Sequence, residues 1–346
     1  MNIGNVIDFL KSYDGKPIRL MEVCGTHTAS ISQNAIPSLL SDKIELISGP
    51  GCPVCVTVSD YTNRLIELAL EGNVIVSFGD MIRVPGSHQA LQDIKAQGAD
   101  IRMVYSPMQA LDLAQAQPSK QFVFAAVGFE TTTPIYALLI DEAIKRGVKN
   151  LKLLTALKTM PEVVAKICDD KDSRIDGFLA PGHVCAITGS DLFTPLAKKY
   201  KLPFVVSGFE AQEILAAIYA LVKMQGEGKV LNLYKSTVKS QENEKAHEIV
   251  SKYFEKCDAA WRGLGIIEGS GMALRDEYSS YDAGSRELKS DESHNKGCKC
   301  GDIITGKAKP SECPLYSKVC TPENPMGACM VSTEGTCFNY YENNRE

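Results

Sequence analysis

The sequence has no run that approaches the roughly 20 apolar residues needed for a transmembrane helix, so we expect no membrane span. It also lacks an excess of basic residues: 37 Lys and Arg face 42 Asp and Glu. The formal net charge of -5 argues against a nucleic-acid-binding surface, which needs clustered cations. A signal peptide would need an uninterrupted apolar stretch, and Asp8 interrupts the amphipathic helix expected at the start. These absences predict a cytoplasmic protein.

Cysteine is abundant, with twelve residues in the chain. Thiols stay reduced in the cytoplasm, so many cysteines there indicate metal or redox chemistry rather than structural disulfides. The apolar fraction of 44% and the charged fraction of 23% are typical of a soluble globular protein. At 346 residues the chain is too long for one typical core and predicts two or three domains.

Short β-branched runs alternate with amphipathic helix patterns from about residue 18 to residue 225. Such alternation predicts βαβ units and mainly parallel sheet. Two segments, AAVGFETTTPIYALL and VVSGFEAQEILAAIY, both read as strand, Gly-Phe-Glu and helix, which suggests two α/β domains of similar build. The expected strands are Ile18–Val23, Ile44–Ile47, Val74–Phe78, Ile101–Tyr105, Phe122–Val127, Leu151–Thr155, Gly177–Ala180 and Phe204–Ser207.

The expected fold class is therefore α/β, with two similar parallel-sheet α/β domains plus a small cysteine-rich iron–sulfur domain. We place the boundaries at 14–128, 129–228 and 229–346, with 1–13 available to pack on the last of these. The final fifty residues hold six of the twelve cysteines and few long apolar runs. Because such a segment buries little core, something other than hydrophobic burial must hold it together.

Two further expectations concern the chain beyond residue 226. Residues 241–258 read as one charged amphipathic helix, and residues 263–274 as an extended piece broken by glycines. Residues 278–296 are polar and read as a mobile loop.

Five glycine-bearing loops follow expected strands: MEVCGTHT, GPGCPVC, GDMIRVPG, GFETTTP and PGHVC. Ligands of open parallel sheets bind beyond the carboxyl ends of the strands, so these loops should face one cleft. Cys24 should lie near the start of a helix around Ala29, where the helix dipole favours the metal-binding thiolate. His27 could bind the same ion or accept a proton from Cys24. A lone buried thiol would favour a packing role, but His27 and its threonine and glycine neighbours favour function.

Cys52 and Cys55 have the spacing of a dithiol–disulfide pair at the start of a helix. No second C-x-x-C is present to complete a zinc site, because Cys298 and Cys300 are separated by a single residue. The pair is therefore either a redox centre or part of a metal site, and simple packing is the remaining alternative.

The carboxyl-terminal tail offers six sulfurs for a metal centre. Its gaps are looser than those of zinc ribbons, and the standard ferredoxin spacing is absent. The loose spacing and the Cys313-Pro314 step favour a [4Fe–4S] cluster over zinc. Our choice of ligands is Cys300, Cys313, Cys320 and Cys337, with Cys298 and Cys329 as alternates.

Other polar residues of the expected cleft are Glu130, Thr131, Thr132 and His183, with Cys185 undecided. Glu130 is a candidate catalytic residue, and its alternative role is a carboxylate that accepts backbone hydrogen bonds at a helix start. Cys168 and Cys257 lie in helical patterns and are expected to pack.

Together these motifs resemble one family, the [NiFe]-hydrogenase maturation protein HypD. The loops above and the tail CPLYSKVCTPENPMGACMVSTEGTC occur in the family's order over nearly the whole chain. One departure is Cys185, where the family pattern has serine after PGHV. The resemblance implies a scaffold that binds iron and assembles the Fe(CN)2CO group of [NiFe]-hydrogenase with a HypC-type chaperone and a HypE-type cyanide donor.

The resemblance also implies residue roles. Cys24 would be an iron ligand with His27 beside it, and the Cys52 and Cys55 pair would exchange electrons with a [4Fe–4S] cluster in the tail. Helix starts bind anions, so Thr28, Thr131 and Thr132 could donate hydrogen bonds to cyanide, with His183 nearby. An iron–sulfur-dependent thiol–disulfide reductase and a zinc-stabilised interaction protein remain alternatives, and whether the scaffold is itself an enzyme stays open.

Overall fold

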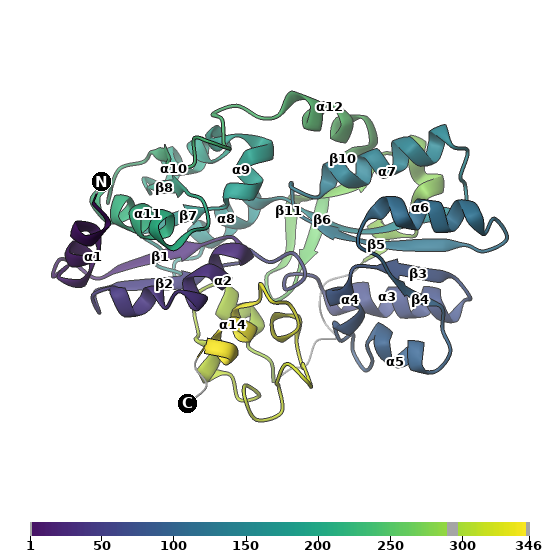
Figure 1. Ribbon diagram of the computed structural model, residues 1–346, viewed down its shortest axis with the longest axis horizontal. Helices are drawn as coiled ribbons and strands as arrows, with labels where there is room; N and C mark the ends of the chain where they lie inside the picture. Colours follow the sequence, from purple (N-terminus) through teal and green to yellow (C-terminus); the bar gives the residue numbers. More distant parts are fainter. Residues whose placement is uncertain (1, 289–296, 344–346) are drawn as a thin grey trace.

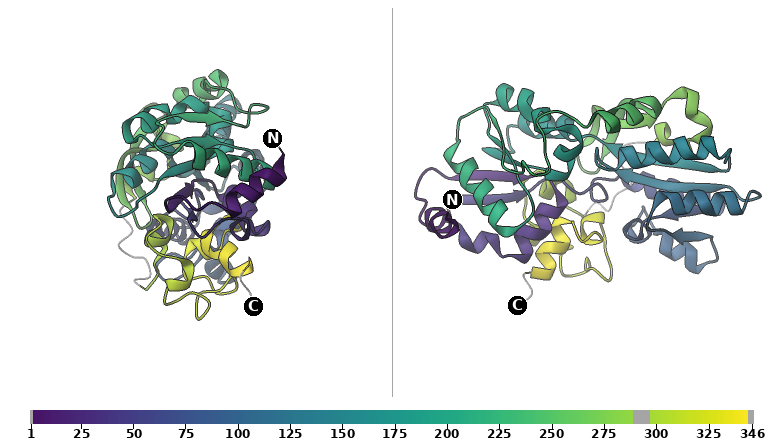
Figure 2. Two further views of the ribbon diagram at one scale, coloured as in Figure 1. Left: turned by 90° about the vertical axis from the view of Figure 1, so that its left-hand side faces the viewer. Right: turned by 45° about the horizontal axis from the view of Figure 1, so that its top comes forward.

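The computed structural model describes residues 2–288 and 297–343. It has two lobes, each built around one sheet, and the cysteine-rich segment lies beside both of them (Figures 1 and 2). Both sheets are mainly parallel, which confirms the expected α/β class with a cysteine-rich carboxyl-terminal region.

The first sheet has the order β2-β1-β7-β8-β9, and all its neighbouring strands are parallel. Helices cover both faces, since buried side chains of α1, α2 and α11 pack on one face and those of α8 to α10 on the other. The strands are β1 (Ile18–Glu22), β2 (Ile44–Ser48), β7 (Gly177–Ala180), β8 (Phe204–Val206) and β9 (Val230–Asn232). The helices are α1 (Ile3–Lys11), α2 (Gly25–Gln33), η1 (Ile36–Leu39), α8 (Met160–Asp169), α9 (Gly182–Thr188), η2 (Ser190–Phe193), α10 (Thr194–Tyr200) and α11 (Ala211–Lys223).

The second sheet has the order β10-β11-β6-β5-β3-β4, in which β3 to β6 are parallel and the β10–β11 hairpin is antiparallel to β6. The central strand β5 is buried over its whole length, so its side chains are apolar on both faces. The strands are β3 (Val74–Ser77), β4 (Ile101–Met103), β5 (Phe122–Gly128), β6 (Leu151–Lys158), β10 (Phe254–Trp261) and β11 (Gly265–Leu274). The helices are α3 (Ser59–Leu70), α4 (Gly79–Arg83), α5 (Leu91–Ala96), α6 (Pro107–Ala116), α7 (Thr133–Lys145) and α12 (Glu244–Tyr253).

The lobes do not follow the contiguous division expected at residue 128. The chain starts in the first lobe, passes through β3 to β6 in the second, returns for β7 to β9, and adds β10 and β11 to the second. Local apolar patterns identify strands but not their partners, and β1 pairs with β7 across a long stretch of chain. Helix α1 packs on α11, where Phe9 and Tyr219 have ring centroids 5.0 Å apart, rather than on the cysteine-rich segment.

One local expectation is wrong. The helix expected over 241–258 ends at Tyr253, because Phe254 pairs with Leu274 and the chain continues as β10. The expected loop 278–296 contains short 3-10 turns in its described part, η3 (Asp276–Tyr281) and η4 (Ser285–Glu287), and residues 289–296 lie outside the described residues.

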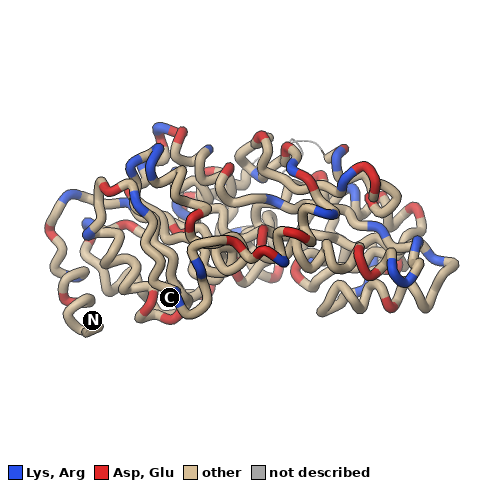
Figure 3. The backbone as a smooth tube through the Cα atoms, turned by 90° about the horizontal axis from the view of Figure 1, so that it is seen from above, with Lys and Arg blue, Asp and Glu red and all other residues tan. Residues whose placement is uncertain are grey.

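Short elements make up the cysteine-rich segment: α13 (Cys300–Ile304), η5 (Pro310–Glu312), η6 (Ala328–Met330) and α14 (Thr336–Asn343). Its buried residues Cys300 and Cys329 belong to the same apolar cluster as Cys52 and Cys55, so the segment shares a core with the first lobe. In Figure 3 basic and acidic residues are interspersed along the molecule. Within residues 2–288 and 297–343 no helix is long and apolar enough to cross a membrane.

Candidate functional site

The loops that carry Cys24 and the Cys52–Cys55 pair are joined through their backbones. Gly25 N–H donates to the Gly51 carbonyl at 3.0 Å, and Gly49 N–H donates to the Glu22 carbonyl at 2.7 Å. A Cβ atom on Gly51 would lie 2.1 Å from the Cys24 nitrogen, so only glycine permits this approach. The two cysteine motifs therefore meet beyond the carboxyl ends of β1 and β2.

Cys52 and Cys55 form a disulfide whose Cα atoms are 5.2 Å apart. Both residues are buried, with 4% and 3% of their surface exposed, in the apolar cluster that also contains Cys300 and Cys329. The pairing agrees with the dithiol–disulfide spacing of the sequence. Its burial means that a large protein substrate cannot reach the disulfide without a local opening.

Cys24 caps the start of α2, which begins at Gly25 and not near Ala29. Burial raises the pKa of the Cys24 thiol to about 12, although hydrogen bonds from the backbone of His27 and Thr26 favour the thiolate. The negative charge of Glu22 adds to the rise. Desolvation therefore opposes the effect of the helix start, which by itself favours the thiolate.

Glu22 is a site residue that sequence reasoning missed. Its carboxylate is buried and accepts hydrogen bonds from the Cys24 backbone at 2.9 Å and from the Thr28 hydroxyl. Burial raises its pKa to about 7. No signal in the sequence pointed to these partners, because β1 carries a second charged residue, Arg19, and neither stands out from the pattern. The Thr28 hydroxyl is expected from the sequence to donate a hydrogen bond to a ligand. In the structure it donates its hydrogen bond to Glu22.

His27 is fully buried, and its Nε2–H donates to the Gly208 carbonyl at 3.0 Å. Burial lowers its pKa to about 4, so the ring is neutral at physiological pH. Its Nδ1 atom is buried and has no hydrogen-bond partner in the described chain. The hydrogen bond from Nε2–H fixes the neutral tautomer in which Nδ1 keeps a free lone pair. A metal ion requires this form of the ring.

Phe209 lies between the two expected histidines. Its ring centroid is 4.8 Å from that of His27 and 4.1 Å from that of His183, which is exposed. His183 therefore stacks beside the site, while His27 is enclosed within it.

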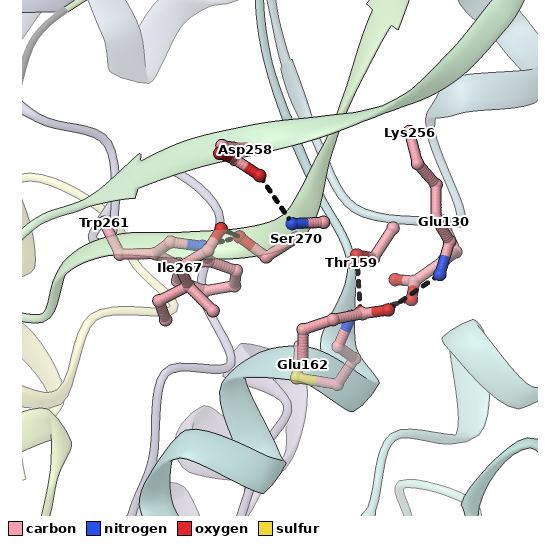
Figure 4. Close-up of polar contacts among 10 residues, drawn as sticks. Glu130, Thr159, Glu162, Lys256, Asp258, Trp261, Ile267 and Ser270 are labelled. Carbon is pink, nitrogen blue, oxygen red and sulfur yellow. Dashed lines mark hydrogen bonds and ion pairs between the residues drawn. The ribbon is translucent and has the colours of Figure 1, made fainter.

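The Glu130 side chain reaches the first turn of α8 rather than the first turn of α7, the helix that follows it in the sequence. Its Oε1 atom accepts a hydrogen bond from Met160 N–H at 2.7 Å, next to Glu162 (Figure 4). Its Oε2 atom is buried without a hydrogen-bond partner among the described residues, and burial raises the pKa of Glu130 to about 7. Burial, together with the charges of Glu130 and Cys24, raises the pKa of Cys185.

Thr131 and Thr132 lie at the start of α7, with hydroxyl oxygens 3.3 Å apart. Both are partly exposed. Their placement at a helix start is as expected.

The tail cysteines gather around Cys300. Its sulfur lies 2.9 Å from that of Cys329, which also contacts Cys337. Burial raises the pKa of Cys298 to about 12, with a contribution from the charge of Cys300, and the same charge acts on Cys320. In the described chain no group of three or more His, Cys, Asp or Glu side chains is already arranged as a metal site. The convergent thiols nevertheless form a soft donor set suited to an iron–sulfur cluster.

Arg262 links the disulfide loop to the tail. This residue does not stand out in the sequence. Its backbone N–H donates to the Val56 carbonyl at 2.9 Å, and its Nε–H donates to the Thr57 carbonyl at 2.8 Å. Its positive charge acts on Cys298 of the tail. The tail also reaches Cys24's helix, because Thr26 donates to the Glu334 carboxylate at 2.7 Å.

Fold and site define an α/β protein with a thiol-rich site and a cysteine-rich carboxyl-terminal segment. Residues 3–344 match the HypD family model, described as "Hydrogenase formation hypA family". The hydrogenase maturation factor HypD of Rhodobacter capsulatus is 39% identical over 98% of this chain and 93% of its own length. Those of Escherichia coli and Cupriavidus necator are 40% and 41% identical, over 94% and 96% of this chain and 89% and 91% of their own lengths. The chain belongs to the HypD family of hydrogenase maturation factors, which confirms the resemblance seen in its motifs.

Proposed function

We propose that this protein is the scaffold on which iron receives the cyanide and carbon monoxide ligands of the Fe(CN)2CO group of [NiFe]-hydrogenase. The observation that carries the proposal is the contact between the Cys24 and Cys52–Cys55 loops, made possible by Gly51. It brings a thiol, a neutral histidine and a dithiol–disulfide pair to one place. Family membership supplies the hydrogenase context.

Cys24 and His27 are the proposed holders of the iron. The unpartnered Nδ1 lone pair of His27 supports this role, because a buried ring nitrogen without a partner is unfavourable unless something binds it. The charges of Glu130 and Cys24 both contribute to the raised pKa of Cys185, which supports including Cys185 in the proposed site. Thr131 and Thr132 are the remaining candidates to donate hydrogen bonds to cyanide.

Electrons for ligand chemistry would come from the Cys52–Cys55 pair. Two thiols release two electrons and two protons when they form the disulfide seen in the structure. The tail cysteines would hold a [4Fe–4S] cluster, which supplies one-electron transfer. Contacts of Cys329 with Cys300 and Cys337 support Cys329, an alternate in the choice made from spacing, as one of the four ligands.

The proposed partners are a HypC-type chaperone and a HypE-type cyanide donor. A cavity of about 480 Å³ next to the first turn of α2, lined by Thr26, Phe209, Glu210 and Glu334 among others, offers an approach to this side of the site. The alternative of a protein disulfide reductase is less well supported, because both sulfurs of the disulfide are on buried residues.

The test compares Cys52→Ser with Cys168→Ser in cells that need this protein for hydrogenase. Cys168 is half-buried and lies in a helix outside the site. We expect the first variant to fold and retain its iron but to abolish maturation, and the second to behave as wild type. Normal hydrogenase activity with Cys52→Ser would rule out an essential dithiol.

A further inference from the structure

A second cavity, of about 410 Å³, lies on the other lobe between β6, the β10–β11 hairpin and α3. Its walls include Tyr61, Ala156, Lys158, Cys257, Met272 and Arg286. This volume is within the range of small-molecule sites. None of these residues belongs to the proposed iron site.

Lys158 is the unusual residue of this cavity. It is the last residue of β6, only 3% of its surface is exposed, and it has no ion pair or hydrogen bond from its ammonium group to any described residue. The ammonium nitrogen lies 5.6 Å from the centre of the Trp261 ring. Burial lowers the pKa of Lys158 to about 8, and the opposing effect comes from the Cys257 thiol rather than from a carboxylate. A buried cation of this kind is costly unless it is paired.

The other charged side chains around the cavity already have hydrogen-bond or ion-pair partners. Lys256 pairs with Glu162 at 2.8 Å, and Asp258 accepts a hydrogen bond from Gly269 N–H at 2.9 Å (Figure 4). Arg286 pairs with the Glu255 carboxylate at 2.5 Å. Among the described residues of the cavity wall, Lys158 is therefore the one cation left without an anionic partner.

We propose that this cavity binds a small organic monocarboxylate, with its carboxylate group on the Lys158 ammonium. A single free cation matches a single negative charge, whereas phosphate groups are usually bound by several donors. Val58, Met272 and Leu288 provide an apolar wall for the organic part of the ligand. Lysine acts as a compact point charge, so the carboxylate needs no bidentate geometry.

Trp261 provides a direct readout because it is the sole tryptophan of the chain and lies under the Lys158 ammonium. We would titrate the full-length protein with sodium butyrate at constant ionic strength and follow tryptophan emission, with sodium chloride as the reference. We expect saturable binding by wild type, and affinity at least roughly tenfold weaker in Lys158→Met, because a charge-assisted hydrogen bond is lost. Lys256→Met, which changes a paired lysine of the same cavity, should bind as wild type.

A wild-type measurement keeps the test independent of the variants. Butyrate affinity should fall as pH rises through about 8, where Lys158 loses its charge. Burial raises the pKa values of Cys257 and Tyr61, so the neutral forms of these cavity residues persist through this range. Absence of saturable butyrate binding, equal loss in both lysine variants, or tighter binding of inorganic phosphate would each overturn the proposal.

Discussion

Substitution of Gly51 by alanine tests the contact on which the proposed iron site depends. The added Cβ would lie 2.1 Å from the Cys24 nitrogen and 2.5 Å from its Cα, while ordinary contacts begin at 3.4 Å. Because backbone atoms cannot rotate away, the two loops must separate by about 1 Å, and the Gly25–Gly51 hydrogen bond is lost or weakened. Overpacking and that bond together predict a loss of about 2–4 kcal/mol in the free energy of unfolding.

Urea unfolding of anaerobically purified protein measures this loss. Gly79→Ala is the matched control, because its Cβ would meet only the flexible Met103 side chain, at 3.2 Å. We expect the control to change the free energy of unfolding by less than about 1 kcal/mol. Gly51→Ala should also stop hydrogenase maturation at temperatures where the variant stays folded. Equal stability of the two variants would refute the close approach of the loops.

Three further predictions concern other parts of the molecule. Asp141→Asn should lower stability at neutral pH, because two lysines and a tyrosine hold the pKa of Asp141 well below its usual range. That loss should diminish as pH falls below about 4, where the unfolded carboxyl protonates. Tyr61→Phe should cost about 1 kcal/mol, since its buried hydroxyl donates to a β6 carbonyl at 2.8 Å. Cys329→Ser should reduce iron and sulfide per chain, whereas Cys168→Ser should not.

Each of these three predictions has a result that would contradict it. A stability difference for Asp141→Asn that is unchanged between pH 7 and pH 3 would show that its charge is not responsible. An unaltered urea midpoint for Tyr61→Phe would mean that its hydroxyl bond adds no net stability. Full iron and sulfide content in Cys329→Ser would exclude that cysteine as a necessary ligand.

The sequence predicted the class of fold better than its arrangement. Strand–helix alternation is a local signal, and the strands from β1 to β8 appear where the apolar runs place them. Strand partners are decided by contacts between distant segments, so the return of the chain to the first sheet at β7 was not readable from the pattern. The helix expected to include Phe254 failed for the same reason, because pairing with β11 overrides local periodicity.

The site shows a similar limit. The Cys52–Cys55 pairing followed from spacing, and the loops of Cys24 and Cys52 meet at a sheet edge, as the parallel-sheet rule indicates. The raised pKa of Cys24 did not follow from the sequence, because burial depends on the packed structure. Glu22 and Arg262 were missed since a single charged residue near an apolar run gives no signal of its partners.

The central claim is that Cys24 holds the iron that carries cyanide and carbon monoxide. Infrared spectroscopy of this protein co-purified with a HypC-type chaperone measures the stretching bands of those ligands directly. We predict clear bands in wild type and none in Cys24→Ala, with the iron and sulfide of the tail unchanged. Bands of full intensity in Cys24→Ala would contradict the account.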